Sequence, residues 1–88
     1  MKLVFTKPFA RDYHKLPAHR QRQLDKQLEL LLDNPRHPSL QARVVDRQRR
    51  IWKAQINGGC RFTFQMEDDQ IVLRRVGGHG EMERPERW

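Results

Sequence analysis

The spacing of the apolar residues changes part-way along this chain, and that change limits the folds it can adopt. Leu24, Leu28, Leu31 and Leu32 stand at positions i, i+4, i+7 and i+8, a spacing typical of one face of a helix. From Ile51 onward, apolar and polar residues alternate, which is typical of strands with one buried face. The sequence therefore predicts a helical first part followed by a sheet.

Proline residues delimit the two predicted helices. A short strand over residues 3–5 precedes a first helix over about residues 8–16. Pro17 interrupts that helix and suits the first turn of a second one, where a missing N–H costs no hydrogen bond. The second helix ends before Pro35, because the residue preceding a proline is pushed out of the helical region. These elements form a helical hairpin with one apolar side.

The second part of the chain predicts antiparallel strands. A short strand is expected over residues 42–45, and clearer ones over residues 51–56 and 71–76. A further strand, with Phe62, Phe64 and Met66 on one face, lies between the last two of these. The turn at Asp68-Asp69 separates it from the final strand. The residues expected to face the helices across the central hairpin are Trp52, Ala54, Ile56, Phe62, Phe64 and Met66.

The turn of this hairpin determines which residues face each other. All the expected core residues have even numbers, so a two-residue turn at Gly58-Gly59 would pair even residues with odd ones and turn one strand inside out. We therefore expect a three-residue loop, Gly58-Gly59-Cys60, with glycine at a positive φ angle. Such a loop pairs Ile56 with Phe62, Ala54 with Phe64, and Trp52 with Met66.

The odd-numbered residues of the hairpin must then point away from the helices, onto an open sheet surface. One reading is an ordinary solvated face, which antiparallel sheets commonly have. The other is a binding surface, because the face carries two cations and several hydrogen-bonding groups. Its members are Lys53, Gln55, Arg61, Thr63 and Gln65.

Charge and cysteine content restrict the class of partner and the cellular compartment that we expect. The 88 residues carry a formal net charge of +7, and arginine supplies most of the cations. Because the guanidinium group binds phosphate and carboxylate in a bidentate manner, this excess favours nucleic acid or an acidic protein as partner. With Cys60 alone, no internal disulfide can form, and we expect a reducing cytoplasm. The chain shows no long apolar run or secretory signal, and its length suits one domain over residues 1–88.

Three segments resemble the RelE/ParE toxin superfamily of type II toxin–antitoxin systems. Ile-Trp-Lys-Ala-Gln-Ile-Asn (residues 51–57) and Cys-Arg-Phe-Thr-Phe (residues 60–64) resemble the central hairpin of these toxins. Ile-Val-Leu-Arg-Arg-Val-Gly-Gly-His (residues 71–79) resembles their last strand, with the Gly-x-His ending of the YafQ and HigB branch. The resemblance implies an α+β, RelE-like fold in which an N-terminal strand and a helical hairpin pack on a small antiparallel sheet (β-α-α-β-β-β).

The resemblance also implies site residues. His79 would act in proton transfer and Arg61 would contact the scissile phosphate, with Lys53 as a further cation. Glu81 is either a second proton carrier or a surface carboxylate. At three positions the chain departs from common residues of the superfamily, with Gln55, Cys60 and Gly80. The residues expected to contact RNA are Lys53, Gln55, Arg61, Arg74 and Arg75; no metal ligand and no cofactor is expected.

The implied function is a toxin that cuts messenger RNA on the ribosome, through attack of the RNA's own 2′-hydroxyl on the adjacent phosphate. This chemistry requires an acid, a base and cations, but no metal. A cognate antitoxin is the expected protein partner, operator DNA is expected only through the toxin–antitoxin complex, and no membrane is involved. Two alternatives remain: a ParE-like gyrase inhibitor that acts by binding, and an inactive relative that binds only antitoxin and operator DNA.

Overall fold

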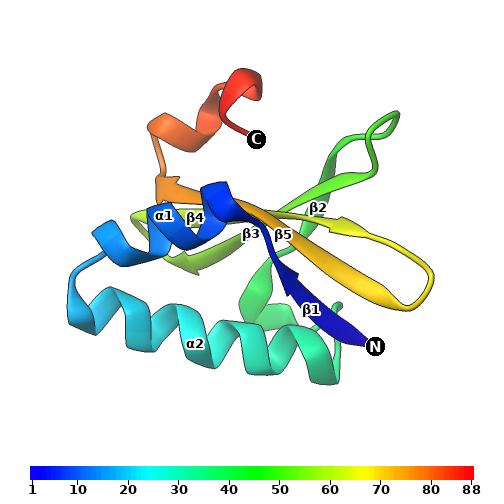
Figure 1. Ribbon diagram of the computed structural model, residues 1–88, viewed down its shortest axis with the longest axis horizontal. Coiled ribbons are helices and arrows are strands. Elements are labelled where there is room, and N and C mark those ends of the chain that lie inside the picture. The colour runs from blue at the N-terminus through cyan, green and yellow to red at the C-terminus, as the bar shows by residue number, and fades with distance from the viewer.

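A five-stranded sheet with two helices on one side makes up the computed structural model, which describes residues 1–88 (Figure 1). The strand order is β1-β5-β4-β3-β2, with β1 parallel to β5 and every other pair antiparallel. The predicted α+β fold is confirmed; four strands follow the helices, and β1 adds one parallel pair. The elements are β1 (Lys2–Phe5), α1 (Lys7–Lys15), α2 (Ala18–Asp33), β2 (Arg43–Asp46), β3 (Ile51–Asn57), β4 (Cys60–Met66) and β5 (Gln70–Gly78), with short 3₁₀ helices at Pro38–Leu40, Glu81–Glu83 and Pro85–Arg87.

Local side chains set the start of α1 and the docking of both helices. Thr6 caps α1, since its Oγ1 accepts the Phe9 N–H at 3.3 Å and also donates to the Leu73 carbonyl of β5 at 2.7 Å. In α2 the buried Gln27 amide donates to the backbone carbonyl of Gln55 at 2.8 Å, which ties this helix to β3. Neither helix is long and apolar enough to cross a membrane.

The apolar stripe of α2 differs from the prediction at one position. Leu24, Leu28 and Leu31 are buried as expected, but Leu32 is 42% exposed, and Gln27 takes a place in the buried face. With 3.6 residues per turn, residues at i, i+3, i+4 and i+7 share one stripe, and i+8 falls at its rim. The prediction that Leu32 is buried was therefore wrong.

The hairpin of β3 and β4 keeps the predicted faces but not the predicted partners. Trp52 pairs with Phe64, and Ala54 with Phe62, a shift of two residues from the expected register. The turn has two residues, Gly58 and Gly59, neither at a positive φ angle, so the three-residue loop was wrong. The odd residue stands instead in a β-bulge between Gln55 and Asn57, which restores the even pairing that the core requires. Ala54, Ile56, Phe62 and Phe64 are buried, while Trp52 and Met66 are half-buried and pack against the core.

The second face of the sheet is not open, contrary to the prediction. Residues 79–88, called the C-terminal segment below, lie across the sheet from α2 (Figure 1). Beneath them Lys53 and Thr63 are buried, as are Ile51 and Met82, which lie outside the main hydrophobic core. The alternation of the strands was right, but it does not reveal that a later part of the chain folds back over this face.

Two neighbouring leucines test the corrected stripe of α2. Leu31→Ala should lower the free energy of unfolding by about 2–5 kcal/mol, because it leaves a cavity in the core. Leu32→Ala, the matched control, should cost less than about 1 kcal/mol, because Leu32 lies at the rim. Urea denaturation followed by circular dichroism measures both. Equal losses in the two variants would contradict the assignment.

Candidate active site

A pocket of about 200 Å³ gathers four of the predicted site residues on the second face of the sheet. His79, Arg61, Lys53 and Gln55 all line it. They come together because β3 and β4 present their odd-numbered side chains on this face, and because β5 ends beside the turn between these strands. Three further lining residues, Gln41, Arg43 and Glu83, were not predicted from the sequence. The core residue Ala54 completes the lining.

His79 stands at the rim of this pocket, directly after β5. Its backbone N–H donates to the Gly59 carbonyl at 2.8 Å, which fixes the residue against the β3–β4 turn. Its ring Nε2 lies 3.2 Å from Oε1 of Glu83, and both side chains are about half exposed. The sequence offered no signal for Glu83, because His79 lies in a turn and only Glu81–Glu83 form a short 3₁₀ helix.

Lys53 is buried, although it carries a charge. Its side chain is 6% exposed; its Nζ donates to the Met82 carbonyl at 3.2 Å and lies 4.0 Å from Oε2 of Glu83. The ammonium also sits 5.6 Å from the centroid of the Trp88 ring, a cation–π distance. Lys53 therefore lines the pocket as a largely buried cation that the C-terminal segment holds in place.

Arg61 and Arg43 supply the accessible positive charge. The Nη1 of Arg61 donates to the backbone carbonyls of Asn57 at 2.7 Å and Cys60 at 3.0 Å, neutral acceptors that leave its charge uncompensated. Arg43 is exposed and lies opposite Lys53 in the β2–β3 pairing, on the same face of the sheet. Three cations and one carboxylate therefore line the pocket, which favours an anionic ligand.

Glu81 and the two arginines of β5 lie elsewhere. Glu81 packs against Gly77, where an added methyl group would collide with its carboxylate, and its Oε2 lies 3.7 Å from Nη1 of Arg87. Arg75 binds Asp12 of α1 through Nε at 2.7 Å and Nη2 at 3.2 Å, and this hydrogen bonding raises the pKa of Arg75. Arg75 therefore forms a structural ion pair with Asp12.

A β-bulge in β5 sends Arg74 away from the pocket. Thr63 pairs with Arg75 and Phe64 pairs with Leu73, so Arg74 is the extra residue between them. Its Nε donates to the main-chain oxygen of Trp88 at 2.8 Å, and burial lowers its pKa, with a further contribution from the charge of Arg49. The structure thus separates Arg74 from His79 and makes it an anchor for the C-terminal segment.

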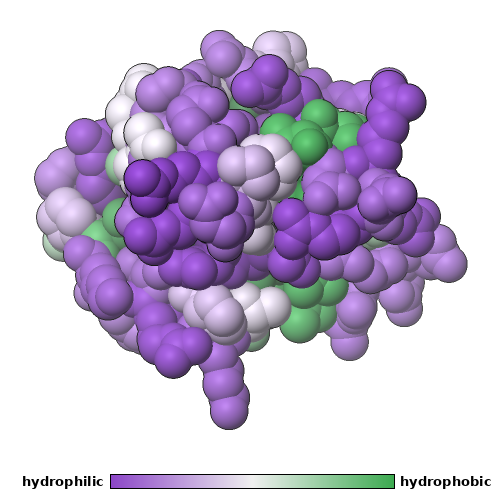
Figure 2. Space-filling view, turned by 90° about the horizontal axis from the view of Figure 1, so that it is seen from above, coloured by the Kyte–Doolittle hydropathy of each residue, from purple (hydrophilic) through white to green (hydrophobic).

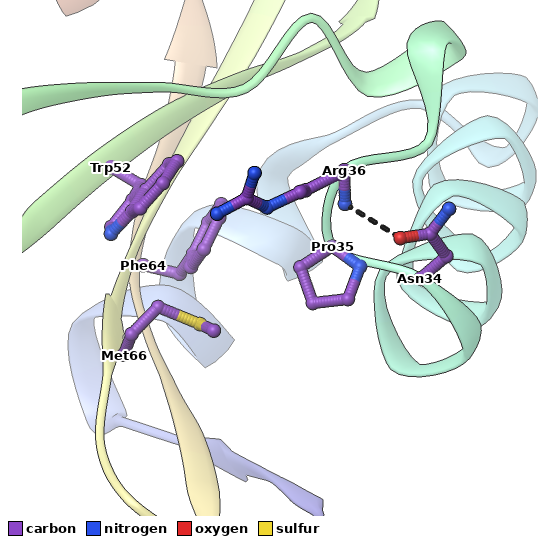
Figure 3. A pocket seen from close by; sticks show the side chains of 6 residues that line it. All are labelled: Asn34, Pro35, Arg36, Trp52, Phe64 and Met66. Carbon is purple, nitrogen blue, oxygen red and sulfur yellow. Dashed lines mark hydrogen bonds between the residues drawn. The ribbon is translucent and has the colours of Figure 1, made fainter.

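A second, apolar hollow of about 240 Å³ lies between the end of α2 and the sheet (Figure 3). The rings of Trp52 and Phe64 are stacked at 6.2 Å and 13°, and Figure 3 shows Pro35 and Arg36 facing them across the hollow. It has no pair of groups for acid–base chemistry, so it is not the candidate active site. No three His, Cys, Asp or Glu side chains gather as a metal site would require.

Comparison with known proteins identifies the family. The sequence profile of ParE toxins of type II toxin–antitoxin systems (parDE) matches residues 3–83. The chain belongs to this family. It is thus a toxin of a type II toxin–antitoxin system, and the predicted RelE/ParE superfamily is confirmed. No curated protein matches this sequence.

Solved structures of the superfamily share the fold of this toxin. A YoeB/ParE toxin from Agrobacterium tumefaciens is 16% identical, with a TM-score of 0.76 over 90% of this chain and 99% of its own. YafQ from E. coli BL21(DE3) is 16% identical, with a TM-score of 0.73 over 91% and 94%. The RelBE2 toxin–antitoxin complex from Mycobacterium tuberculosis contains a chain that is 22% identical, with a TM-score of 0.73 over 89% and 96%. At these identities the likeness shows the fold alone.

The ion pair between Asp12 and Arg75 gives a test of the structural role of Arg75. Asp12→Ala should lower the free energy of unfolding by about 1–3 kcal/mol, because it leaves the Arg75 guanidinium and the Val76 N–H without their acceptor. Asp68→Ala, in an exposed turn, is the matched control and should change stability by less than about 0.5 kcal/mol. Thermal unfolding measures both, and an unaffected Asp12→Ala would contradict this role.

Proposed function

We propose that this toxin is a ribosome-dependent endoribonuclease that cuts messenger RNA without a metal. The observation that supports the proposal most is the pocket in which His79 lies with Arg61, Arg43 and Gln55. A proton-transfer group beside uncompensated cations is what cleavage of a phosphodiester needs. The face seen from above in Figure 2 is largely hydrophilic, in keeping with a polyanionic ligand.

The proposed reaction uses the RNA's own hydroxyl as nucleophile. The 2′-oxygen forms a bond to the adjacent phosphorus as the bond to the 5′-oxygen breaks, which leaves a 2′,3′-cyclic phosphate and a 5′-hydroxyl. His79 transfers the proton of the 2′-hydroxyl, since an imidazole can both accept and donate a proton. Arg61, with Arg43 beside it, stabilises the charge on the phosphorane, and Gln55 hydrogen-bonds the RNA. Lys53 contributes positive potential without direct contact.

The match to the ParE toxins favours a second candidate function. The two functions differ in their products: one yields cut messenger RNA and the other yields stalled gyrase on intact RNA. An inactive relative would yield neither.

Substitutions at Arg61 and His79 test the proposal. His79→Ala should slow cleavage by about 10²–10⁴-fold, the usual contribution of general acid–base catalysis. Arg61→Ala should also slow it, and Arg61→Lys should not restore the parent rate, because the bidentate fork is lost. Single-turnover cleavage of messenger RNA in programmed ribosomes measures these rates, with circular dichroism to confirm folding.

Two exposed residues of the helices serve as matched controls. His19→Ala and Arg11→Ala remove the same side chains outside the pocket and should cleave at the parent rate. A His79→Ala variant that cleaves as fast as the parent would refute the proton-transfer role. A parent that leaves RNA intact while gyrase stalls would establish the second candidate instead.

The proposed protein partner is an acidic antitoxin, and operator DNA is bound only through that complex. Support comes from the net charge of +7 and from the RelB–RelE antitoxin–toxin complex of Methanococcus jannaschii, whose toxin shares this fold. Co-expression with the product of an adjacent reading frame for a small acidic protein should restore growth, and the two proteins should co-purify. The affinity, measured by titration calorimetry, should fall as salt rises from 0.05 to 0.5 M, because the Debye length shortens about threefold over this range. A toxin that is harmless alone and binds no acidic partner would contradict this assignment.

A further inference from the structure

Glu83 bridges His79 and Lys53 at the mouth of the pocket. Its Oε1 lies 3.2 Å from Nε2 of His79, and its Oε2 lies 4.0 Å from Nζ of Lys53. A carboxylate that accepts the proton of one ring nitrogen fixes the orientation of the imidazole and leaves the other nitrogen, here Nδ1, for proton exchange. We propose that Glu83 is the positioning residue of His79 and that Trp88 holds it in place through Lys53 and Met82. The inference rests on the proposed endoribonuclease function.

The burial of Lys53 shows how Glu83 is fixed. The Glu83 side chain is 51% exposed, and such a carboxylate would otherwise sample several rotamers. Lys53 cannot follow it into solvent, because its ammonium donates to the Met82 carbonyl and lies under the Trp88 ring. The buried cation is thus a fixed point for the carboxylate. Lys53 acts through Glu83 and does not itself touch the phosphate.

Trp88 covers Lys53 and binds the Met82 carbonyl. Its Nε1 donates to the same Met82 carbonyl at 2.9 Å, so Trp88 and Lys53 grip one oxygen next to Glu83. Its main-chain oxygen accepts from Nε of Arg74 at 2.8 Å, which docks the residue on β5. Without the indole, Met82 loses one donor, Lys53 loses its cover, and Glu83 is no longer held beside His79.

The chemistry follows from the atoms involved. In the proposed step, Oε1 of Glu83, which lies 3.2 Å from Nε2, accepts the Nε2–H of His79, and Nδ1 takes the proton of the 2′-hydroxyl as the 2′-oxygen bonds to phosphorus. The bond to the 5′-oxygen breaks, that oxygen takes a proton from water, and the hydroxide left behind is neutralised by the proton that the imidazolium then releases. The resulting imidazolium lies against the Glu83 carboxylate, which stabilises it. Glu81, bound to Arg87, makes no contact of this kind.

A double-mutant cycle separates this role from a merely structural one. Glu83→Gln and Trp88→Leu should each slow single-turnover cleavage roughly 10- to 100-fold while RNA affinity stays unchanged, because the positioning affects the chemical step. The double variant should be no slower than Glu83→Gln alone, since Trp88 acts through Glu83. Trp88→Phe, which keeps a ring over Lys53 but lacks the indole donor, should lie between the parent and Trp88→Leu. Additive losses in the double variant would overturn the proposal.

Matched substitutions in the same segment complete the test. Arg84→Ala and Glu86→Gln change exposed residues outside the pocket and should cleave at the parent rate. A larger loss in Glu81→Gln than in Glu83→Gln would overturn the assignment of Glu83.

A structural readout distinguishes failure of this inference from failure of the proposed function. Nuclear Overhauser contacts between the Glu83 side chain and the His79 ring should be present in the parent and in Arg84→Ala, and lost in Trp88→Leu. Contacts that persist in Trp88→Leu would overturn the role of Trp88, whatever the activity. A parent that shows these contacts but cuts no RNA would refute the endoribonuclease function instead.

Discussion

The pleat of the β3–β4 hairpin is the constraint on which the rest of the toxin depends. Ala54 and Phe62 must face the helices, so Lys53 and Arg61 must face the other way. The bulge near Ile56 allows a two-residue turn to coexist with this division, because one unpaired residue restores the alternation. The main core and the candidate active site are thus opposite sides of the same seven-residue strands.

Local patterns were sufficient to predict the elements and their faces. The leucine spacing located α2, the prolines located its boundaries, and the alternation located β3 to β5. The exact hairpin partners could not be predicted, because a bulge and a longer loop both satisfy the same even pairing. The exposure of Leu32 was predictable in principle, since a strict helical period puts it at the rim of the stripe.

The candidate site was predictable in part. His79, Arg61, Lys53 and Gln55 meet as expected, because the strand faces were right. The roles of Glu83 and Trp88 depend on how residues 79–88 fold back over the sheet. No periodic pattern in the sequence predicts this path, because the segment consists of turns and two short 3₁₀ helices. The positions of the Arg74 and Arg75 guanidinium groups could not be predicted for a related reason: a bulge and a distant aspartate determine where they lie.

Ile51 of β3 and Met82 of the C-terminal segment are both buried, yet neither belongs to the core that α1 and α2 cover. Because the segment contributes no residue to that core, we expect it to detach as a local unfolding unit of its own. Warming or mild denaturant would then release the segment while the sheet and helices remain intact. In this toxin the lifetime of the assembled site and the lifetime of the fold are therefore two separate quantities, governed by different side chains.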